Sequence, residues 1–329
     1  MREPPEVGRP RLGASFLLTP LGYPYLLVPL IPIAVVLDLV GAPATAAFTA
    51  SALGIIPTAA LMGRATEELA ARSGPGIGGL LNVTFGNAPE LIIALFALGQ
   101  GLHEVVKASI VGSIIGNVLL VLGAAMLAGG IGREKQHFSP TGASIQTSML
   151  MLAAAALVMP AIFELVEGKG LPQPGSEAIH YGGTVEHLSL AVAIVLMATY
   201  VIGLFFSLKT HRDLFNPEYE DEDSWGWSVR TSVIALAIAG VLVGVMSEVL
   251  VGSITEASQS IGLSEFFIGA IVVAIVGNAA EHWVAVLVAR KDKMDLAVNI
   301  SIGSSAQVAL FVAPALVFAS YLIGPGPMP

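Results

Sequence analysis

Two copies of one five-residue motif carry the side chains with the clearest chemical potential. Gly86-Asn87-Ala88-Pro89-Glu90 recurs 191 residues later as Gly277-Asn278-Ala279-Ala280-Glu281, and both copies lie inside long apolar segments. An ionisable side chain at membrane depth is expensive, so by default it indicates a functional site. Two acids in the same frame suggest one site built from two halves. The alternative, a pair of buried neutral acids bonded to backbone, does not explain the duplication.

These residues favour the binding of a hard cation. Glycine and proline both interrupt helices, so we expect a kink or break beside Glu90 and a weaker kink at the second copy, where Ala280 replaces proline. Interrupted backbone at membrane depth is tolerated where it lines a cavity, and its free carbonyls can join the carboxylates. Oxygen ligands with two carboxylates suit calcium. The candidate ion ligands are Glu90 and Glu281, which would bind the metal directly, then Asn87, Asn278, Ser113 and Ser304, with Gln307 and Asn117 as secondary candidates.

Other polar residues near the motifs allow two interpretations. His282 follows Glu281 and can titrate near neutrality, so it is either a proton-handling group or a structural histidine. The candidate serines either join the site or bond the backbone of their own helices. Acids near the ends of apolar segments either form a secondary site or are simply solvated. The secondary site candidates of this kind are Glu68 and Glu248; Glu67 and Glu256 also lie near the ends of apolar segments.

Electrostatics alone suggests how such a site would work. With both glutamates ionised and no cation present, two negative charges would share a low-dielectric slot, and that state is costly. A divalent cation removes the cost, and so do protons. The empty site should therefore resist crossing the membrane while the loaded forms move, which gives obligatory exchange of a cation for protons.

The elements that must hold this site are membrane-spanning helices. The chain has 329 residues, of which 55% are hydrophobic and 12% charged, with a mean hydropathy of +0.80; a soluble domain has about twice that charged share. A spanning helix needs roughly 20 apolar residues. We predict an all-α polytopic protein with about nine spans, near 22–40, 43–66, 76–101, 104–128, 141–165, 184–208, 228–253, 262–289 and 295–322.

Composition excludes several other classes. The absence of cysteine rules out disulfides and thiolate metal sites. The net charge of −9 is uneven, and the 15 Lys and Arg are scattered along loops, so no nucleic-acid partner is expected. The apolar run from Phe16 to Val40 exceeds the length of a signal-peptide core, which favours a retained first helix over a cleaved signal.

Loop charges predict the orientation. If the N-terminus is cytoplasmic, every Lys and Arg except Lys107 and Lys169 falls on the cytoplasmic side, a strong positive-inside bias. The helices that carry Glu90 and Glu281 then cross in opposite senses, as in an inverted repeat. Gly112-Ser113 and Gly303-Ser304 follow the two acids at the same spacing, which extends the repeat.

The motifs resemble the signature repeats of the CAX-type calcium/proton exchangers, in the cation/calcium exchanger superfamily. The residues that carry the resemblance are the two motif copies with Leu91, Ile92 and His282, and the run Gly303-Ser304-Ser305-Ala306-Gln307-Val308-Ala309-Leu310-Phe311-Val312. The resemblance implies that Glu90 and Glu281 carry calcium and protons alternately, with protons favoured over sodium as counter-ion. It also implies a fold of one helix followed by two five-helix repeats.

The resemblance also suggests how the chain is divided. We expect an N-terminal arm and first helix (1–42), a first repeat (43–208), an acidic cytoplasmic linker (209–227) and a second repeat (228–329) with only three helices, which is two fewer than the family has. In the family an acidic stretch between the halves is linked to calcium sensing. In this chain the corresponding residues are Glu218, Glu220, Asp221, Glu222 and Asp223. The alternative interpretation of these residues is a solvated acidic loop without a sensing role.

The predicted function is therefore a secondary transporter and not an enzyme. It would exchange cytoplasmic calcium for external protons by alternating access, without a cofactor, in the plasma (inner) membrane with its N-terminus in the cytoplasm; a homo-oligomer is left open. A sodium or potassium/proton antiporter on the same scaffold is the nearest alternative, and a cation channel is the alternative from another class.

Overall fold

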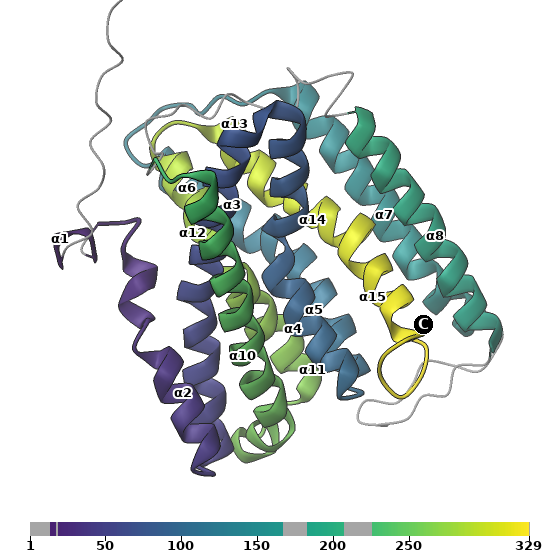
Figure 1. Cartoon of the computed structure of the whole chain (residues 1–329). Coiled ribbons are helices and arrows are strands. Elements are labelled where there is room, and N and C mark those ends of the chain that lie inside the picture. Colours follow the sequence, from purple (N-terminus) through teal and green to yellow (C-terminus); the bar gives the residue numbers. More distant parts are fainter. Residues whose placement is uncertain (1–13, 18, 167–182, 207–225, 329) are drawn as a thin grey trace, which may run out of the picture.

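The computed structural model describes residues 14–17, 19–166, 183–206 and 226–328, and within these parts it is helical throughout with no strand (Figure 1). The acidic stretch at 218–223 and most of the predicted linker lie outside the described residues. The helices before the linker are α1 (Ala14–Leu17), η1 (Tyr23–Leu27), α2 (Leu30–Leu39), α3 (Ala44–Gly86), α4 (Ala88–Gly99), α5 (His103–Ile115), η2 (Gly116–Val121), α6 (Leu122–Gly130), α7 (Pro140–Val166) and α8 (Gly183–Phe205). Those after it are α10 (Val229–Ile261), α11 (Glu265–Phe267), η5 (Ile268–Val273), α12 (Ala274–Arg290), α13 (Met294–Val298), η6 (Asn299–Gly303), α14 (Ser304–Gln307), η7 (Val308–Val312) and α15 (Ala313–Ser320).

The predicted spans all coincide with helices. Within the described residues, seven stretches are long and apolar enough to cross a membrane, and they correspond to seven of the nine predicted positions. An eighth position, 76–101, is a bent pair of helices, Leu80–Gly86 and Ala88–Gly99. The ninth, 22–40, is the shorter apolar helical stretch Tyr23–Leu39. The all-α membrane fold is confirmed.

The first motif breaks its helix and the second does not. α3 ends at Gly86 and α4 begins at Ala88, with Asn87 between them and Pro89 in the first turn of α4. The two helical pieces meet at 42°. α12 runs without interruption through Gly277 to Glu281. Proline has no N–H to continue the helical ladder, so its presence in one copy only explains the difference.

The long α3 is not one straight rod. A Cβ placed on Gly78 would stand 2.5 Å from the carbonyl oxygen of Ala70, eight residues earlier in the chain. That proximity requires the backbone to turn back on itself between the span Ala44–Ser73 and the segment that leads to the first motif. The second predicted boundary between spans, between 43–66 and 76–101, therefore exists as a tight turn within α3.

Four π-helical segments interrupt the helices that pack around the motifs. They are η2, η5, η6 and η7. η2 (Gly116–Val121) and η7 (Val308–Val312) occupy matching positions of the two repeats, because about the same 191 residues separate them as separate the motifs. π-Bulges occur frequently at functional sites, so their position agrees with a site between the repeats.

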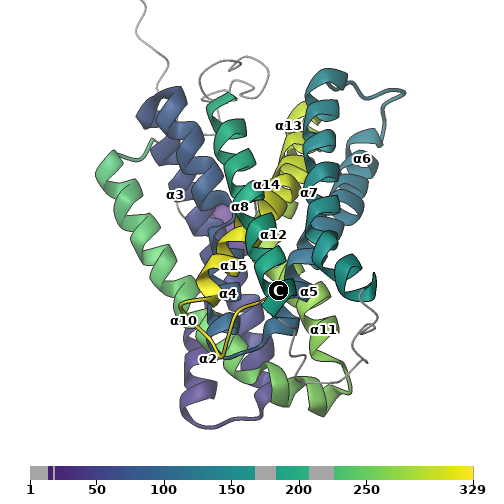
Figure 2. The same cartoon turned by 90° about the vertical axis from the view of Figure 1, so that its right-hand side faces the viewer.

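The bundle places the motif helices at its centre. Figure 2 shows α3 and α10 on one side and α6 and α7 on the other, with α12, α14 and α15 between them. α3 and α10 pack closely enough that a Cβ on Gly54 would lie 3.0 Å from the sulfur of Met246. The main buried apolar cluster includes Ile55, Ile93, Leu250, Ile268 and Leu316, from helices of both halves of the chain.

Candidate ion-binding site

The two motif copies meet face to face. A Cβ on Gly277 would stand 3.1 Å from Cγ of Glu90, and a Cβ on Gly86 would stand 3.3 Å from Oε1 of Glu281. Each glutamate therefore lies against the glycine of the other copy. A larger residue at either glycine would push the opposite carboxylate away, which is a reason for glycine at both positions. The two motif copies therefore lie together, as the prediction of one site built from two halves requires.

Hydrogen bonds also cross between the repeats in a reciprocal pattern. The Ser304 hydroxyl lies 2.9 Å from Oε2 of Glu281 and 3.1 Å from Oδ1 of Asn87. On the other side, Nδ2 of Asn278 donates to the Ser113 hydroxyl at 3.0 Å. Each motif asparagine thus contacts the serine that belongs to the opposite repeat. Asn87 in addition donates to Oε1 of Gln307 at 2.7 Å.

Three oxygen atoms of the motifs are buried without a hydrogen-bond donor. They are both carboxylate oxygens of Glu90 and Oδ1 of Asn278. A buried acceptor without a donor is destabilising, and more so when it carries charge. These oxygens point to a site that is completed by something positive, either a bound cation or a proton on the carboxylate.

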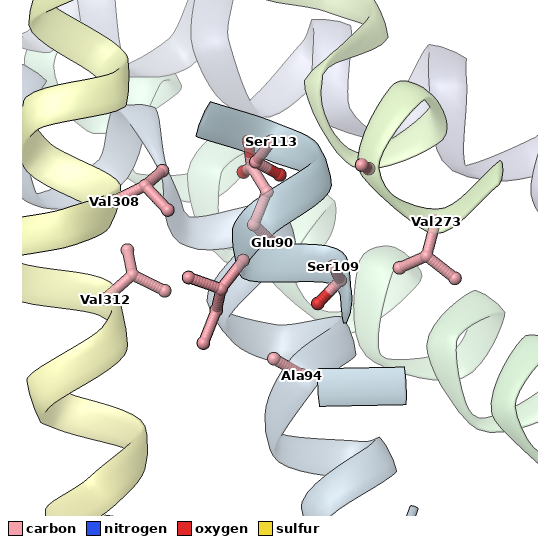
Figure 3. Close-up of a pocket in the computed structure, with 9 residues that line it drawn as sticks. Glu90, Ala94, Ser109, Ser113, Val273, Val308 and Val312 are labelled. Atoms are coloured by element: carbon pink, nitrogen blue, oxygen red, sulfur yellow. The ribbon is translucent and has the colours of Figure 1, made fainter. Parts of the chain in front are cut away.

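A small cavity adjoins Glu90 (Figure 3). Its volume of about 10 Å³ is close to the minimum that one water molecule needs. Its polar walls are Glu90, Ser109 and Ser113, from α4 and α5. Its other walls are apolar and include Val273, Val308 and Val312. The cavity beside Glu90 is therefore narrow and mostly hydrophobic.

His282, next to Glu281 in the chain, contacts the secondary candidate Asn117. Nε2 of His282 lies 2.8 Å from Oδ1 of Asn117, a buried residue of η2. Nδ2 of Asn117 is buried with no acceptor. Among the described residues no group of three His, Cys, Asp or Glu side chains converges on a point. A cation held here would therefore need amide and hydroxyl oxygens in addition to the two glutamates.

The other acidic candidates lie elsewhere. Glu68 is 2% exposed; it accepts a hydrogen bond from Arg64 at 2.6 Å and another from the backbone N–H of Trp227 at 2.9 Å. The interpretation of Glu68 as a solvated helix end was wrong, because Arg64 and Trp227 enclose it. Glu67 also pairs with Arg64, and its side chain is 38% exposed. Glu248 is exposed on α10, outside both motif copies.

One polar pair beside the site escaped the sequence prediction. Nε2 of Gln146, on α7, donates to Oδ1 of Asn299, on η6, and Oε1 of Gln146 is buried without a donor. A Cβ on Gly303 would lie 3.2 Å from Asn299 and 3.6 Å from Gln146, so the pair adjoins the residue before Ser304. The only available signal was an uncharged polar residue inside each of two apolar segments, outside any duplicated pattern.

Comparison with known proteins identifies the family. The sequence profile described as "Sodium/calcium exchanger protein" matches residues 43–209 and 231–327. The chain is 43% identical over 302 residues to a Ca(2+)/H(+) antiporter of Synechocystis sp., an alignment that covers 85% of this chain and 77% of that protein. It is 41% identical over 295 residues to the Ca(2+)/H(+) antiporter ChaA of Bacillus subtilis, covering 88% of this chain and 80% of the relative.

Solved structures agree with the sequence comparison. The structure of native YfkE superposes with a TM-score of 0.77 at 38% identity, covering 93% of this chain and 84% of that one. The H+/Ca2+ exchanger CAX superposes with a TM-score of 0.66 at 16% identity, over 91% and 74% of the two chains, which shows a shared fold. The chain belongs to the sodium/calcium exchanger protein family, and its motifs place it with the calcium/proton exchangers of that family, as their resemblance predicted.

Proposed function

We propose that this protein is an antiporter that exchanges cytoplasmic calcium for external protons, with Glu90 and Glu281 as the shared carriers of both ions. The observation that carries the proposal is the reciprocal packing of the two acids, each against the glycine of the other motif. Relatives at over 40% identity are named Ca(2+)/H(+) antiporters, which supports the choice of ions.

The site chemistry supports coupled exchange. Glu90 has two oxygens without donors, whereas Glu281 accepts one hydrogen bond from Ser304. With both acids ionised and nothing bound, repulsion and desolvation oppose closure of the site around them. Calcium, or protons, neutralise that charge. Only loaded forms then cross, and this coupling requires no separate gating chemistry.

The neutral ligands belong to the same proposal. Asn87, Asn278, Ser113 and Ser304 lie beside the two acids, and their oxygens would replace part of the hydration shell of a calcium ion. Gln307 and Asn117 would position Asn87 and His282. Residues 43–208 and 228–329 would act as the two inverted halves, in a plasma (inner) membrane with the N-terminus cytoplasmic, as the loop charges predict.

The deciding experiment is flux measurement with purified protein in liposomes. Calcium added on one side should drive proton movement in the opposite direction, followed with a pH dye inside the vesicles, and an imposed proton gradient should drive calcium uptake. Sodium and potassium serve as competing ions. Proton flux that is driven by sodium or potassium but not by calcium would show that the protein transports a monovalent ion instead of calcium. Ion conductance without coupled proton movement would show that the protein is a channel and not an antiporter.

Ser304→Ala should raise the KM for calcium about tenfold, because the hydroxyl that orients Glu281 and Asn87 is lost and hydrogen bonds to charged groups are worth more than neutral ones. The matched control is Ser253→Ala, a buried serine of α10 whose hydroxyl bonds the carbonyls of Val249 and Leu250 on its own helix. Calcium-dependent flux across a range of concentrations gives both values. Equal KM values for the two variants would show that Ser304 serves its helix and not the ion.

His282→Gln should change the pH dependence of exchange while calcium affinity stays near its original value. Glutamine can keep the contact with Asn117 but has no imidazole nitrogen that could bind a proton. Exchange rates measured over a range of external pH at saturating calcium would reveal the change. Superimposable pH profiles would mean that His282 is a structural partner of Asn117.

A further inference from the structure

The inverted repeat extends beyond the motifs to two further pairs of glycines. The same offset of 191 residues relates Gly78 to Gly269 and Gly112 to Gly303. In each repeat, one of these glycines precedes the motif and the other follows it. Residues related in this way occupy equivalent places on opposite sides of the membrane, so their surroundings can be compared directly.

On the side where α4 ends and α5 begins, each glycine of these pairs packs directly against the backbone of the other repeat, and we call this contact closed. A Cβ on Gly112 would overlap the carbonyl oxygen of Ala270, and one on Gly269 would stand 2.7 Å from that of Val105. α5 and η5 are therefore packed backbone to backbone. Ile268, at the start of η5, is 0% exposed as a result. The loop charges predict that this is the external side.

On the opposite side, where α12 ends at Arg290, the equivalent contacts are open. The atoms nearest to a Cβ on Gly303 belong to the side chains of Asn299 and Gln146, and those nearest to a Cβ on Gly78 belong to Ala70 of its own helix. In sequence, Gly79 is the counterpart of Ala270. α13 and η6 pack chiefly against α6, α7, α12 and η2. Ile77, the counterpart of the buried Ile268, is 61% exposed. The two repeats therefore have the same sequence pattern but opposite packing states.

We propose that Gln146 holds the Arg290 side of the exchanger open by occupying the place on Gly303 that the backbone carbonyl of Gly79 takes when that side closes. The proposal rests on alternating exchange, because closure here must accompany opening around Gly112. Gln146 belongs to α7, outside the motif helices. It is a positioning residue for the transport cycle and not an ion ligand.

The surroundings of Gln146 suit a contact that forms in one state only. Its Nε2 donates to Asn299, but its Oε1 is buried without a donor. A partly satisfied amide stabilises its state weakly, so a competing contact can displace it. Asn299 is the counterpart of Ala108, whose Cβ would touch a Cβ on Gly269 at 3.0 Å. The larger Asn299 must move for the same contact to form on its own side, and it would move together with Gln146.

The test uses distances between spin labels at cysteines that replace Arg72 and Arg290, two exposed residues at the Arg290 side, in the full chain, which has no native cysteine. Pulsed electron resonance should show a main long distance and a minor shorter one. Gln146→Leu keeps the volume but removes the bond to Asn299. It should raise the ratio of short to long populations about fivefold, the size expected for one neutral hydrogen bond. Ser148→Ala, an exposed hydroxyl of α7 that bonds the carbonyl of Ser144, should change nothing.

Two glycine variants test the same proposal from the other direction. Gly303→Ala should remove the short population, because its Cβ would block the carbonyl of Gly79, while the present state needs only a small shift of Asn299. Gly112→Ala should instead favour the short distance, since its Cβ would collide with Ala270 in the present state. If Gly303→Ala does not fold, Gln146→Leu and Gln146→Ala still decide the outcome.

Two results would overturn the proposal: unchanged populations in Gln146→Leu, or shifts of Gln146→Leu and Gly303→Ala in the same direction. The distances are measured without calcium or flux. The label distances therefore test the role of Gln146 separately from the proposed function. If the distances respond as expected but the unaltered protein does not couple calcium to protons, the proposed function is rejected and the role of Gln146 is kept.

Discussion

Replacing either motif glutamate by glutamine should reduce calcium/proton exchange at least about 100-fold. The substitution keeps the size of the side chain but removes both the negative charge and the proton-binding group. One carboxylate with neutral oxygens binds a divalent ion far less well than two. It also leaves the site with a single charge, so the electrostatic difference between its empty and loaded forms shrinks. Flux of calcium and of protons in liposomes measures both losses.

The two variants should differ in stability although both lose transport. Glu90 has no hydrogen-bond donor on either oxygen, so Glu90→Gln removes a buried group that the fold does not satisfy. Its thermal unfolding temperature should stay the same or rise. Glu281→Gln weakens the bond from Ser304 and should lower it slightly. Active sites often hold such unfavourable groups at the expense of stability.

Glu248→Gln is the matched control for this pair. It makes the same chemical change at an exposed glutamate of α10, outside both motif copies. Exchange by this variant should equal that of the unaltered protein. Coupled exchange that survives in Glu90→Gln or Glu281→Gln would exclude that residue as a carrier, and a loss in Glu248→Gln would show that the site extends to α10.

The main features of the site could be predicted because they are encoded twice. The duplicated motif and the matched Gly-Ser spacing identified Glu90, Glu281, Ser113 and Ser304, which the structure brings into one reciprocal cluster. The spans were equally accessible, because the apolar content of each helix is a local property. The single proline explains why one copy breaks its helix and the other does not.

What could not be predicted depends on contacts between distant and unduplicated residues. Gln146 belongs to no duplicated pattern, and only the packing of α7 against η6 brings it to Gly303. Glu68 and Glu248 look alike in sequence, as acids toward the ends of apolar helices. The fold buries the first under Trp227, 159 residues later, and leaves the second exposed. Arg64, four residues before Glu68, has no equivalent near Glu248, but this local difference predicts only an ion pair and not the burial under Trp227.

The buried acid Glu68 gives the second large effect that we expect, this time on stability. Glu68→Ala should destabilise the protein by about 3 kcal/mol, at the lower end for removal of one partner from a buried ion pair. The variant deprives the backbone N–H of Trp227 of its acceptor and removes a buried carboxylate that pairs with Arg64. Because Trp227 lies just before α10, the loss should also loosen the start of that helix against α3.

Glu67→Ala is the matched control, since it removes a neighbouring acid that pairs with the same arginine. The Glu67 side chain is 38% exposed, whereas that of Glu68 is 2% exposed. Water screens the exposed pair, so its removal should cost about 1 kcal/mol or less. Thermal unfolding of both variants in detergent, with tryptophan fluorescence as one probe, gives the comparison. Equal destabilisation by the two substitutions would mean that burial does not decide the strength of these pairs, and that Trp227 is held at α3 by contacts other than Glu68.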